Sequence, residues 1–463
     1  MKTEKLKQNV KGYVHQFEDG GLRLLRKGQK GVIHAIFSRF GLVLILLLLQ
    51  VGLLFSIFRW FGNLWPHYFG GSVVVTSAMV IYLLNSKMDN SAKITWMVVV
   101  AIAPVVGIPM FFYVKSNFGH NILRKRLLEL EDQLRGWLPQ SQKAVEQLKA
   151  LEPGAASLAK YLYGRGGGFP VYQNTAMTYF PGGEAKFEEL LRQLETAEEY
   201  IFVEYFIIDE GLMWGKILEV LARKALQGVD VRVMYDGTCE FSTLPRNYPR
   251  LLEKLNIQCK VFSPVQPFVS THYNYRDHRK ILVIDGRVGF TGGVNLADEY
   301  INHIQKHGRW KDAAVMLEGE AVRSLTAQFL QMWGILKEPE YEQFLTRPIP
   351  VPENAKGVAA PYGDCPLDGE RVGEMVYIDL LNRARDYIHI MTPYLILDGE
   401  LETALKFAAE RGVDVHLILP GKPDKQFPYA LAKSHYSALL DSGVKISEWS
   451  PGFVHAKVFV VDG

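Results

Sequence analysis

The sequence has little cysteine, little net charge and no compositionally biased tract. Its three cysteines, Cys239, Cys259 and Cys365, are too few and too scattered for a disulfide framework or a thiolate metal site. The 52 basic and 49 acidic residues leave a net charge of +3, which argues against a protein held on nucleic acid by bulk positive charge. The 41 glycines and 22 prolines do not gather in one tract, so the chain is neither fibrous nor disordered. Its 463 residues leave room for two or three domains.

Apolar residues are concentrated near the N-terminus. A basic segment at 1–39 precedes an uncharged run at 40–58, which is long enough to cross a bilayer core of about 30 Å. Further apolar runs follow at 61–85 and 94–114, and the prolines in the last run are tolerated in membrane helices. We therefore expect residues 40–114 to form two or three transmembrane helices of a multi-pass protein of the cell membrane. Basic residues flank this region on both sides, and the positive-inside rule then disfavours an odd number of full spans.

Two similar halves follow an amphipathic linker at 115–167, in which leucines at helical spacing predict an amphipathic helix at 121–150. In the first half, at 168–345, we expect helices at 186–199 and 214–227 and strands at 200–208 and 230–235. In the second half, at 346–463, we expect helices at 374–387 and 400–411 and strands at 388–391 and 414–419. The pattern AxxGVDVxxx begins at 225 and again at 409, and a proline-rich joint lies at 348–352. These features predict an α/β fold whose mixed sheet, with helices on both faces, has been duplicated.

Each half also contains the motif H-x-K-x4-D-G. Its residues are His278, Lys280 and Asp285 in the first half and His455, Lys457 and Asp462 in the second half. Residues two apart in a strand point the same way, so the histidine and lysine of each motif should project together, and the aspartate falls at the turn that ends the strand. A neutral imidazole is a nucleophile or general base near neutral pH, and an ammonium group stabilises phosphoryl oxygens. Two such pairs facing each other predict a phosphate clamp with one nucleophilic and one acidic histidine.

With these motifs the chain resembles the phospholipase D superfamily and, within it, the bacterial cardiolipin synthases. The resemblance runs from about residue 40 to the end. It includes the duplicated motif, GGVNLADEY at 292–300 and the segment from MTPY to PGKPD at 391–424. It implies the duplicated phospholipase D fold and the condensation of two phosphatidylglycerols to cardiolipin and glycerol through a phosphatidyl-histidine intermediate. The implied partners are phosphatidylglycerol and membrane phospholipid, with no nucleic acid, no metal and no other cofactor.

The resemblance also implies roles for single residues. His278 is the implied nucleophile and His455 the acid that protonates the leaving glycerol, while the sequence leaves the reverse assignment open. The remaining matches are the phosphate-binding Lys280 and Lys457, the motif aspartates Asp285 and Asp462 with an expected structural effect, the phosphate-approaching Asn295, and Asp312, the acid expected to orient the first histidine. His303 and His307 lie four residues apart without a carboxylate between them, so we do not expect a metal site there.

Other functions stay open at this stage. A phospholipase D-type phosphodiesterase that hydrolyses phospholipid, with water taking the second step, is the main alternative, because no motif reports how well the pocket excludes water. Phosphatidylserine synthesis and a non-enzymatic membrane scaffold are further alternatives. The sequence stops one residue after Asp462, so we expect the natural protein to continue with a second asparagine segment and an acid that orients His455. A protein that ended at Gly463 is expected to have negligible activity.

Overall fold

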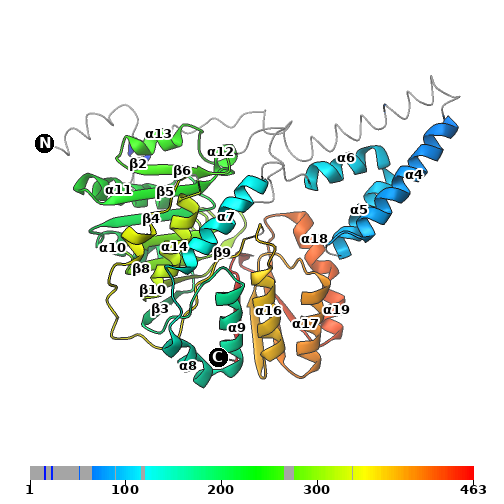
Figure 1. Ribbon diagram of the computed structural model, residues 1–463. Coiled ribbons are helices and arrows are strands. Elements are labelled where there is room, and N and C mark those ends of the chain that lie inside the picture. Colours follow the sequence, from blue (N-terminus) through cyan, green and yellow to red (C-terminus); the bar gives the residue numbers. More distant parts are fainter. Residues whose placement is uncertain are drawn as a thin grey trace. The chain divides into compact units, whose positions relative to one another are not determined.

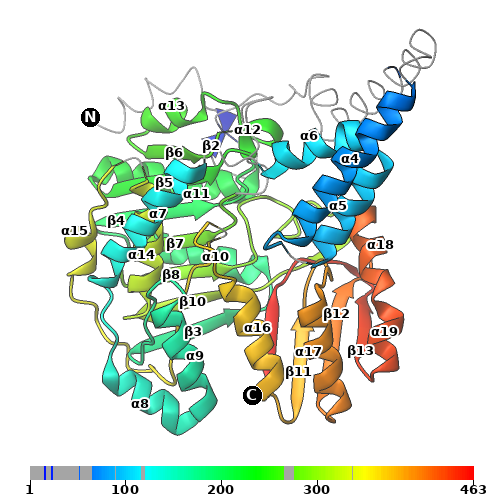
Figure 2. The ribbon, with the colours of Figure 1, turned by 45° about the vertical axis from the view of Figure 1, so that its right-hand side comes forward.

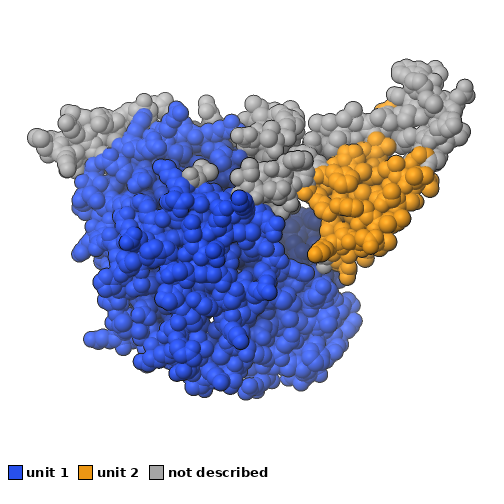
Figure 3. All heavy atoms as spheres, in the orientation of Figure 1, with its two compact units in different colours: residues 1–26, 120–265, 275–463 blue, residues 27–119, 266–274 orange. Residues whose placement is uncertain are grey.

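The computed structural model describes residues 15–16, 22–23, 52, 65–88, 90–115, 120–264, 276–335, 337–365 and 367–462. The chain divides into two compact units (Figure 3), one of residues 1–26, 120–265 and 275–463 and the other of residues 27–119 and 266–274. The run at 40–58, which the sequence predicts to be the first transmembrane helix, lies outside the described residues apart from residue 52. At the N-terminus, β1 (His15–Gln16) and β2 (Leu22–Arg23) pair antiparallel.

Between residues 65 and 115 the smaller unit forms the helices α4 (Trp65–Leu84), α5 (Asn90–Ile102) and α6 (Pro104–Lys115). They pack through Met79, Leu83, Val100 and Phe111. The apolar run at 94–114 does not form one membrane-spanning helix, because it contributes to both α5 and α6. The break falls at Ala103, since a proline disfavours helical backbone in the residue before it and suits the first position of the next helix. Within the described part of the chain, no helix combines the length and apolarity needed to cross a membrane.

The linker is also divided into separate helices, α7 (His120–Arg135), α8 (Gln142–Leu151) and α9 (Pro153–Gly164). The continuous amphipathic helix expected at 121–150 is therefore wrong, and Gly136 and Pro139 lie in the interruption between α7 and α8. The leucine spacing correctly predicts which side of α7 is buried, since Leu127 and Leu134 pack into the core of the first half.

The first half contains a seven-stranded mixed sheet of order β3-β10-β8-β7-β4-β5-β6 (Figure 1). Its strands are β3 (Thr175–Phe180), β4 (Tyr200–Tyr205), β5 (Asp230–Asp236), β6 (Gln258–Phe262), β7 (Lys280–Ile284), β8 (Val288–Gly292) and β10 (Ala314–Gly319). One face is covered by α10 (Gly183–Leu194), α11 (Leu212–Gln227) and α13 (Tyr248–Glu253), and the other by α7, α14 (Val322–Trp333) and α15 (Tyr341–Leu345). Successive residues of β4 accordingly enter opposite cores, Ile201 on one face and Phe202 on the other. A short helix, α12 (Cys239–Ser242), follows β5.

The second half contains a four-stranded sheet of order β13-β12-β11-β15 (Figure 2). Its strands are β11 (Tyr387–Met391), β12 (Asp414–Pro420), β13 (Lys445–Trp449) and β15 (Val458–Val461). Its helices are α16 (Val372–Arg383), α17 (Gly399–Glu410), α18 (Gln426–Ser434) and α19 (Tyr436–Asp441). The described helices pack on one face, whereas His389 and Val460 are exposed on the other. The expectation of helices on both faces therefore holds for the first sheet only.

The predicted duplication is confirmed by the strand pairing. In the first half β4 pairs antiparallel with β7 and parallel with β5, which pairs parallel with β6. In the second half β11 pairs in the same way with β15 and β12, and β12 with β13. The register repeats too, since Tyr200 lies opposite Asp230 and Tyr387 opposite Asp414. The two halves are joined by β9 (Arg309–Lys311) and β14 (Gly452–Val454), which pair in parallel.

Each motif aspartate closes the turn after its strand, with the same hydrogen bonds in both halves. Asp285 and Asp462 have positive φ angles of 51° and 49°. The Asp285 carboxylate accepts backbone N–H groups of residues 198, 199 and 200 at 3.0, 2.8 and 2.8 Å. The Asp462 carboxylate accepts those of residues 385, 386 and 387 at 2.8, 2.9 and 2.9 Å. These contacts tie the motif strand to the start of β4 or β11, which is a structural role.

Replacing Asp285 with alanine should therefore destabilise the fold. Three backbone N–H groups lose a charged acceptor, and alanine is poorly suited to the left-handed backbone, so we expect the free energy of unfolding to fall by about 2 kcal/mol. Urea unfolding of the purified protein, followed by circular dichroism, measures this change. Asp285→Asn keeps one acceptor oxygen and tolerates the same φ, so it should lose less. An unchanged unfolding midpoint for Asp285→Ala would contradict the structural role.

Candidate active site

The first motif lies where β7 begins, in the middle of the seven-stranded sheet. His278 precedes the strand and lines a cavity of about 730 Å³, where its ring is partly shielded from bulk water. Its ring packs against Phe206, with the ring centroids 4.7 Å apart. Lys280 is the first residue of β7 and is buried, and its Nζ donates a hydrogen bond to the carbonyl oxygen of His278. The histidine and lysine of the first motif are thus held together.

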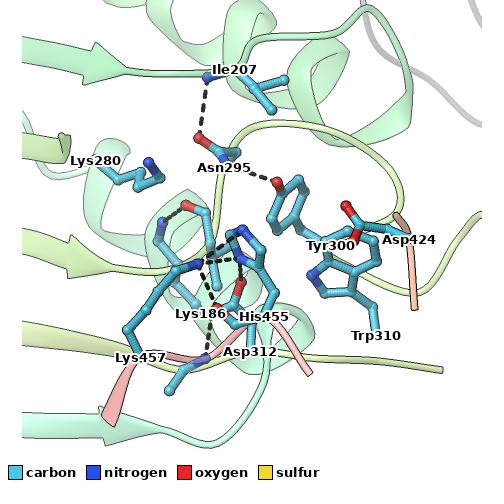
Figure 4. Close-up of polar contacts among 12 residues, drawn as sticks. Lys186, Ile207, Lys280, Asn295, Tyr300, Trp310, Asp312, Asp424, His455 and Lys457 are labelled. Carbon is cyan, nitrogen blue, oxygen red and sulfur yellow. Dashed lines mark hydrogen bonds and ion pairs between the residues drawn. The ribbon is translucent and has the colours of Figure 1, made fainter. Parts of the chain in front are cut away.

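The second motif has the same local arrangement and is anchored to the first half. The backbone N–H of His455 donates to the Lys311 carbonyl at 2.7 Å, directly after the pairing of β14 with β9. Lys457 Nζ donates to the His455 carbonyl at 2.6 Å and lies 2.9 Å from its Nε2 (Figure 4). In both halves, therefore, the lysine ammonium folds back onto its own histidine.

Asp312 contacts the second histidine. Its Oδ2 lies 2.7 Å from Nδ1 of His455, and the Asp312 side chain has no exposed surface. Gly293 makes this position possible, because a Cβ on that residue would overlap Oδ1 of Asp312. The expectation that Asp312 orients the first histidine is therefore wrong, as is the expectation that no acid for His455 lies within this sequence. Because a carboxylate only accepts hydrogen bonds, the contact favours a proton on Nδ1 and leaves Nε2 for chemistry.

The two motifs lie close enough for their charges to act on each other, and the pairing of β14 with β9 holds the second motif against the first half. Withdrawal of the His278 ring from bulk water, followed by the charges of Lys280, Lys457 and His455, lowers the pKa of His278 to about 3. Burial and the charge of Lys457 lower the pKa of Lys280 to about 7. Burial lowers the pKa of Lys457 to about 8. His278 is therefore neutral at physiological pH, and the joint contact of both motifs with one phosphate stays a prediction.

His455 differs from His278 in its surroundings. Burial lowers the pKa of His455, and the hydrogen bond to Asp312 opposes this shift. Aromatic rings surround the imidazole, with centroids 5.3 Å away for Tyr300, 5.5 Å for Trp310 and 6.1 Å for Phe453. Of the two histidines, His455 is the one whose protonated form has a carboxylate to stabilise it.

Comparison with known proteins identifies the family. A family model described as "Cardiolipin synthase, PLD-like domain" matches residues 190–333 and 377–463, which contain both motifs. The cardiolipin synthase of Geobacillus kaustophilus (strain HTA426) is 36% identical over 397 residues, which cover 84% of this chain and 77% of that protein. The chain belongs to the bacterial cardiolipin synthases of the phospholipase D superfamily.

Two other similar proteins are a second cardiolipin synthase and a protein without an assigned function. The cardiolipin synthase of Halalkalibacterium halodurans (strain ATCC BAA-125 / DSM 18197 / FERM 7344 / JCM 9153 / C-125) is 32% identical over 440 residues, covering 92% of this chain and 85% of that protein. A protein of Streptococcus mutans serotype c (strain ATCC 700610 / UA159), described as uncharacterized, is 56% identical over 384 residues, covering 83% of each chain. The resemblance to the cardiolipin synthases drawn from the sequence motifs is confirmed.

Asn295, the predicted phosphate contact of this cardiolipin synthase family member, is buried and bonded to protein groups. Its Oδ1 accepts the Ile207 N–H at 3.1 Å, and its Nδ2 donates to the Tyr300 hydroxyl at 2.7 Å. Because Tyr300 lies edge-on to His455, these bonds help to hold the wall beside that histidine. A contact between Asn295 and phosphate stays a prediction.

Lys186 is a buried residue near the site that the sequence pattern does not reveal. It lies on α10, and its Nζ donates to the Tyr205 hydroxyl at 2.9 Å and to the Val294 carbonyl at 3.2 Å. Burial lowers its pKa to about 7, and the charge of Asp312 opposes that shift. The sequence places Lys186 in an amphipathic helix among other charged residues, so nothing in the pattern distinguishes it from a lysine on the solvent face.

Proposed function

We propose that the protein transfers a phosphatidyl group from one phosphatidylglycerol to another, giving cardiolipin and glycerol. The observation that carries this proposal is the proximity of two His–Lys pairs in a chain of the cardiolipin synthase family. One pair can bind phosphate, whereas two pairs can also divide the nucleophile and acid roles between two imidazoles.

In the first step an imidazole nitrogen of His278 attacks the phosphorus of a phosphatidylglycerol. A nitrogen–phosphorus bond forms, the phosphorus–oxygen bond to glycerol breaks, and the glycerol oxygen takes the proton from His455. In the second step a glycerol hydroxyl of another phosphatidylglycerol gives its proton to His455 and its oxygen attacks the same phosphorus. The nitrogen–phosphorus bond breaks, cardiolipin leaves, and both histidines return to their starting states.

The surroundings of the two histidines support this division of roles. The depressed pKa of His278 keeps its ring neutral and able to attack. Asp312 supports a protonated His455, as a general acid requires. Lys280 and Lys457 would bind the phosphoryl oxygens, whose charge grows during transfer. This scheme assigns charge stabilisation to the lysines and does not call on a metal ion or another cofactor.

The cavity beside His278 suits the apolar part of a lipid. One side of it is apolar and is lined by Leu123, Leu127 and Leu128 of α7 and Leu325 and Met332 of α14. Charged residues line the rest, among them Arg124, Glu131, Arg279, Asp368 and Glu374. A volume of about 730 Å³ lies within the usual range of ligand sites. In our proposal part of the diacylglycerol group of the donor lipid lies here, with its phosphate at His278.

Membrane association is part of the proposed function. The smaller unit exposes apolar side chains, among them Val73, Val74 and Ile102 with exposed fractions of 61%, 69% and 76%. Exposed apolar side chains gathered on one small unit are typical of a lipid or protein contact. We propose that this unit lies at the cell membrane, where its phospholipid substrates are. The multi-pass arrangement expected from the sequence depends on residues 40–58.

Product analysis tests the proposed reaction. The purified protein is incubated with vesicles of phosphatidylglycerol, and lipids and free glycerol are quantified together. Equal amounts of cardiolipin and glycerol are expected. Phosphatidic acid as the main lipid product would instead identify the hydrolase alternative, in which water takes the second step.

The pH dependence of the reaction should reflect the two lysines. Lys280 and Lys457 have pKa values lowered to about 7 and about 8, so they lose their charge, and with it their hold on phosphate, as pH rises through this interval. His455, the proposed acid, has a pKa below its usual value, so loss of its proton should already lower kcat/KM for phosphatidylglycerol below about pH 7. Above about pH 7 we expect a further fall, by up to about tenfold per pH unit for each lysine. The His278 ring stays neutral down to about pH 3, so its titration does not change kcat/KM between pH 5 and 7.

A lysine-to-arginine substitution shows whether loss of the lysine charge causes the fall in kcat/KM at alkaline pH. Arginine stays charged throughout this range, so Lys280→Arg should move the alkaline limb to higher pH even where its maximum rate is reduced. The measurement is kcat/KM from pH 5 to 10 on vesicles of fixed composition. A profile that is flat from pH 7 to 9 in the unmodified protein would contradict the assignment.

A further inference from the structure

Two buried polar atoms near His455 have no hydrogen-bond partner among the described residues. They are Nε1 of Trp310, a donor, and Oδ1 of Asp424, an acceptor. The other oxygen of Asp424, Oδ2, accepts a hydrogen bond from the Tyr394 hydroxyl at 2.6 Å. Tyr394 belongs to the MTPY segment and Asp424 ends PGKPD, two parts of the family resemblance to which the mechanism above assigns no role.

A continuous set of contacts places these groups on one wall of the active site. The rings of Trp310 and Phe453 lie 4.8 Å apart, and those of Phe453 and Tyr394 lie 6.2 Å apart. Trp310 also packs beside His455, and the charge of Asp424 reaches Lys457, whose pKa it raises against the effect of burial. Figure 4 shows Trp310 and Asp424 on the same side of His455, together with Tyr300.

An unpaired donor and an unpaired acceptor on one wall match the chemistry of a polyol. Burying either atom without a partner costs free energy, which a ligand recovers if it accepts from one and donates to the other. A hydroxyl group can do both, and a glycerol headgroup keeps free hydroxyls while one of its oxygens reacts. An ethanolamine headgroup, by contrast, offers only an ammonium group, which can donate to Asp424 but has no acceptor to offer Trp310.

We propose that the Nε1–H of Trp310 and Oδ1 of Asp424 bind the free hydroxyls of the glycerol headgroup and hold its reacting oxygen at His455. This inference rests on the proposed phosphatidyl transfer and adds the headgroup site to it. The leaving glycerol and the attacking glycerol both exchange a proton with His455, so one site serves both half-reactions. It also gives the reaction its preference for a glycerol acceptor over alcohols without further hydroxyls.

Competition between two alcohols tests the headgroup site. The protein acts on phosphatidylglycerol vesicles in the presence of labelled glycerol, which enters phosphatidylglycerol by exchange, and of 1-propanol, which gives phosphatidylpropanol. The quantity measured is the ratio of kcat/KM for glycerol to kcat/KM for 1-propanol. We expect the unmodified protein to favour glycerol, and Trp310→Phe and Asp424→Asn each to lower the ratio by about tenfold. In Asp424→Asn the Tyr394 hydroxyl takes the one remaining oxygen, so the headgroup loses its acceptor. Because both alcohols react with the same phosphatidyl-enzyme, the ratio does not depend on how much of a variant is correctly folded.

Trp449→Phe is the matched control. Its indole Nε1 is also buried without a partner among the described residues. Trp449 lies at the end of β13 and packs with Val454 and Ala456 rather than against the His455 ring, so the ratio should not change. If Trp310→Phe and Asp424→Asn slow both alcohols equally, Asp424 acts only through the charge of Lys457 or through packing, and the headgroup site is refuted. If the unmodified protein transfers phosphatidyl groups to neither alcohol, the proposed reaction itself fails, and the headgroup site with it.

Discussion

His278→Ala should lower the rate of cardiolipin formation by about 10⁴-fold or more, which is the usual loss when a covalent nucleophile is removed. No other described group at the site offers a neutral nitrogen in the same place, since His455 is committed to Asp312 and the lysines fold back onto backbone carbonyls. Rates are measured on phosphatidylglycerol vesicles. His303→Ala, which changes an exposed histidine of the same half, is the control and should keep the rate of the unmodified protein.

Trapping the intermediate shows which histidine is the nucleophile. Unmodified protein is mixed with phosphatidylglycerol labelled in its acyl chains, denatured rapidly and digested. The label is expected on the peptide that contains His278 and should disappear in His278→Ala. Label on the peptide that contains His455 would reverse the two roles, and no covalent label on either peptide would argue for direct transfer without a phosphatidyl-histidine.

Asp312→Asn should lower kcat by about 10²- to 10⁴-fold while the fold stays intact. An asparagine can present its amide N–H to Nδ1 of His455, which would shift the ring proton to Nε2 and remove the charge that stabilises the imidazolium. The change should therefore impair proton transfer to the leaving glycerol. Asp298→Asn is the matched control, because Asp298 is a buried aspartate of the same half that accepts the N–H groups of Leu212 and Met213. An asparagine keeps an acceptor for one of them, so the rate should change little.

A substrate with a better leaving group distinguishes loss of the acid from loss of the nucleophile. A phosphatidyl ester of p-nitrophenol needs no proton to release its phenolate, so its first turnover should be nearly normal in Asp312→Asn and absent in His278→Ala. The release of p-nitrophenolate is followed by absorbance in a single-turnover experiment. Equal impairment of both variants on this ester would show that Asp312 does not act through protonation of the leaving group.

The sequence was informative where local pattern decides structure. The aliphatic runs and the repeated GVDV segment predicted β4, β5, β11 and β12 to within a few residues. A strand that is covered on both faces consists of a continuous run of apolar residues, which is visible in the sequence. The repeat also predicted the two matching half-sheets, and the position of Asp285 predicted its turn.

The sequence was uninformative where contacts join distant segments. The pairing of Asp312 with His455 depends on β9 lying beside β14, two three-residue strands from different halves whose sequences carry no signal of each other. The break at Ala103 was missed for another reason, since hydropathy reports that a run is apolar but not that it is one helix. Lys186 was missed because its burial depends on contacts with Tyr205 and Val294, which lie far from it in the sequence.

The pairing of β9 with β14 limits how far the two repeats can diverge. After a duplication each copy is ordinarily free to accumulate changes that its own neighbours compensate. Here the carboxylate that supports one imidazole is inherited through the other copy, so a change at position 312 has to be compensated near position 455. The two copies therefore evolve as one catalytic unit, and neither could return to independent existence with its chemistry intact.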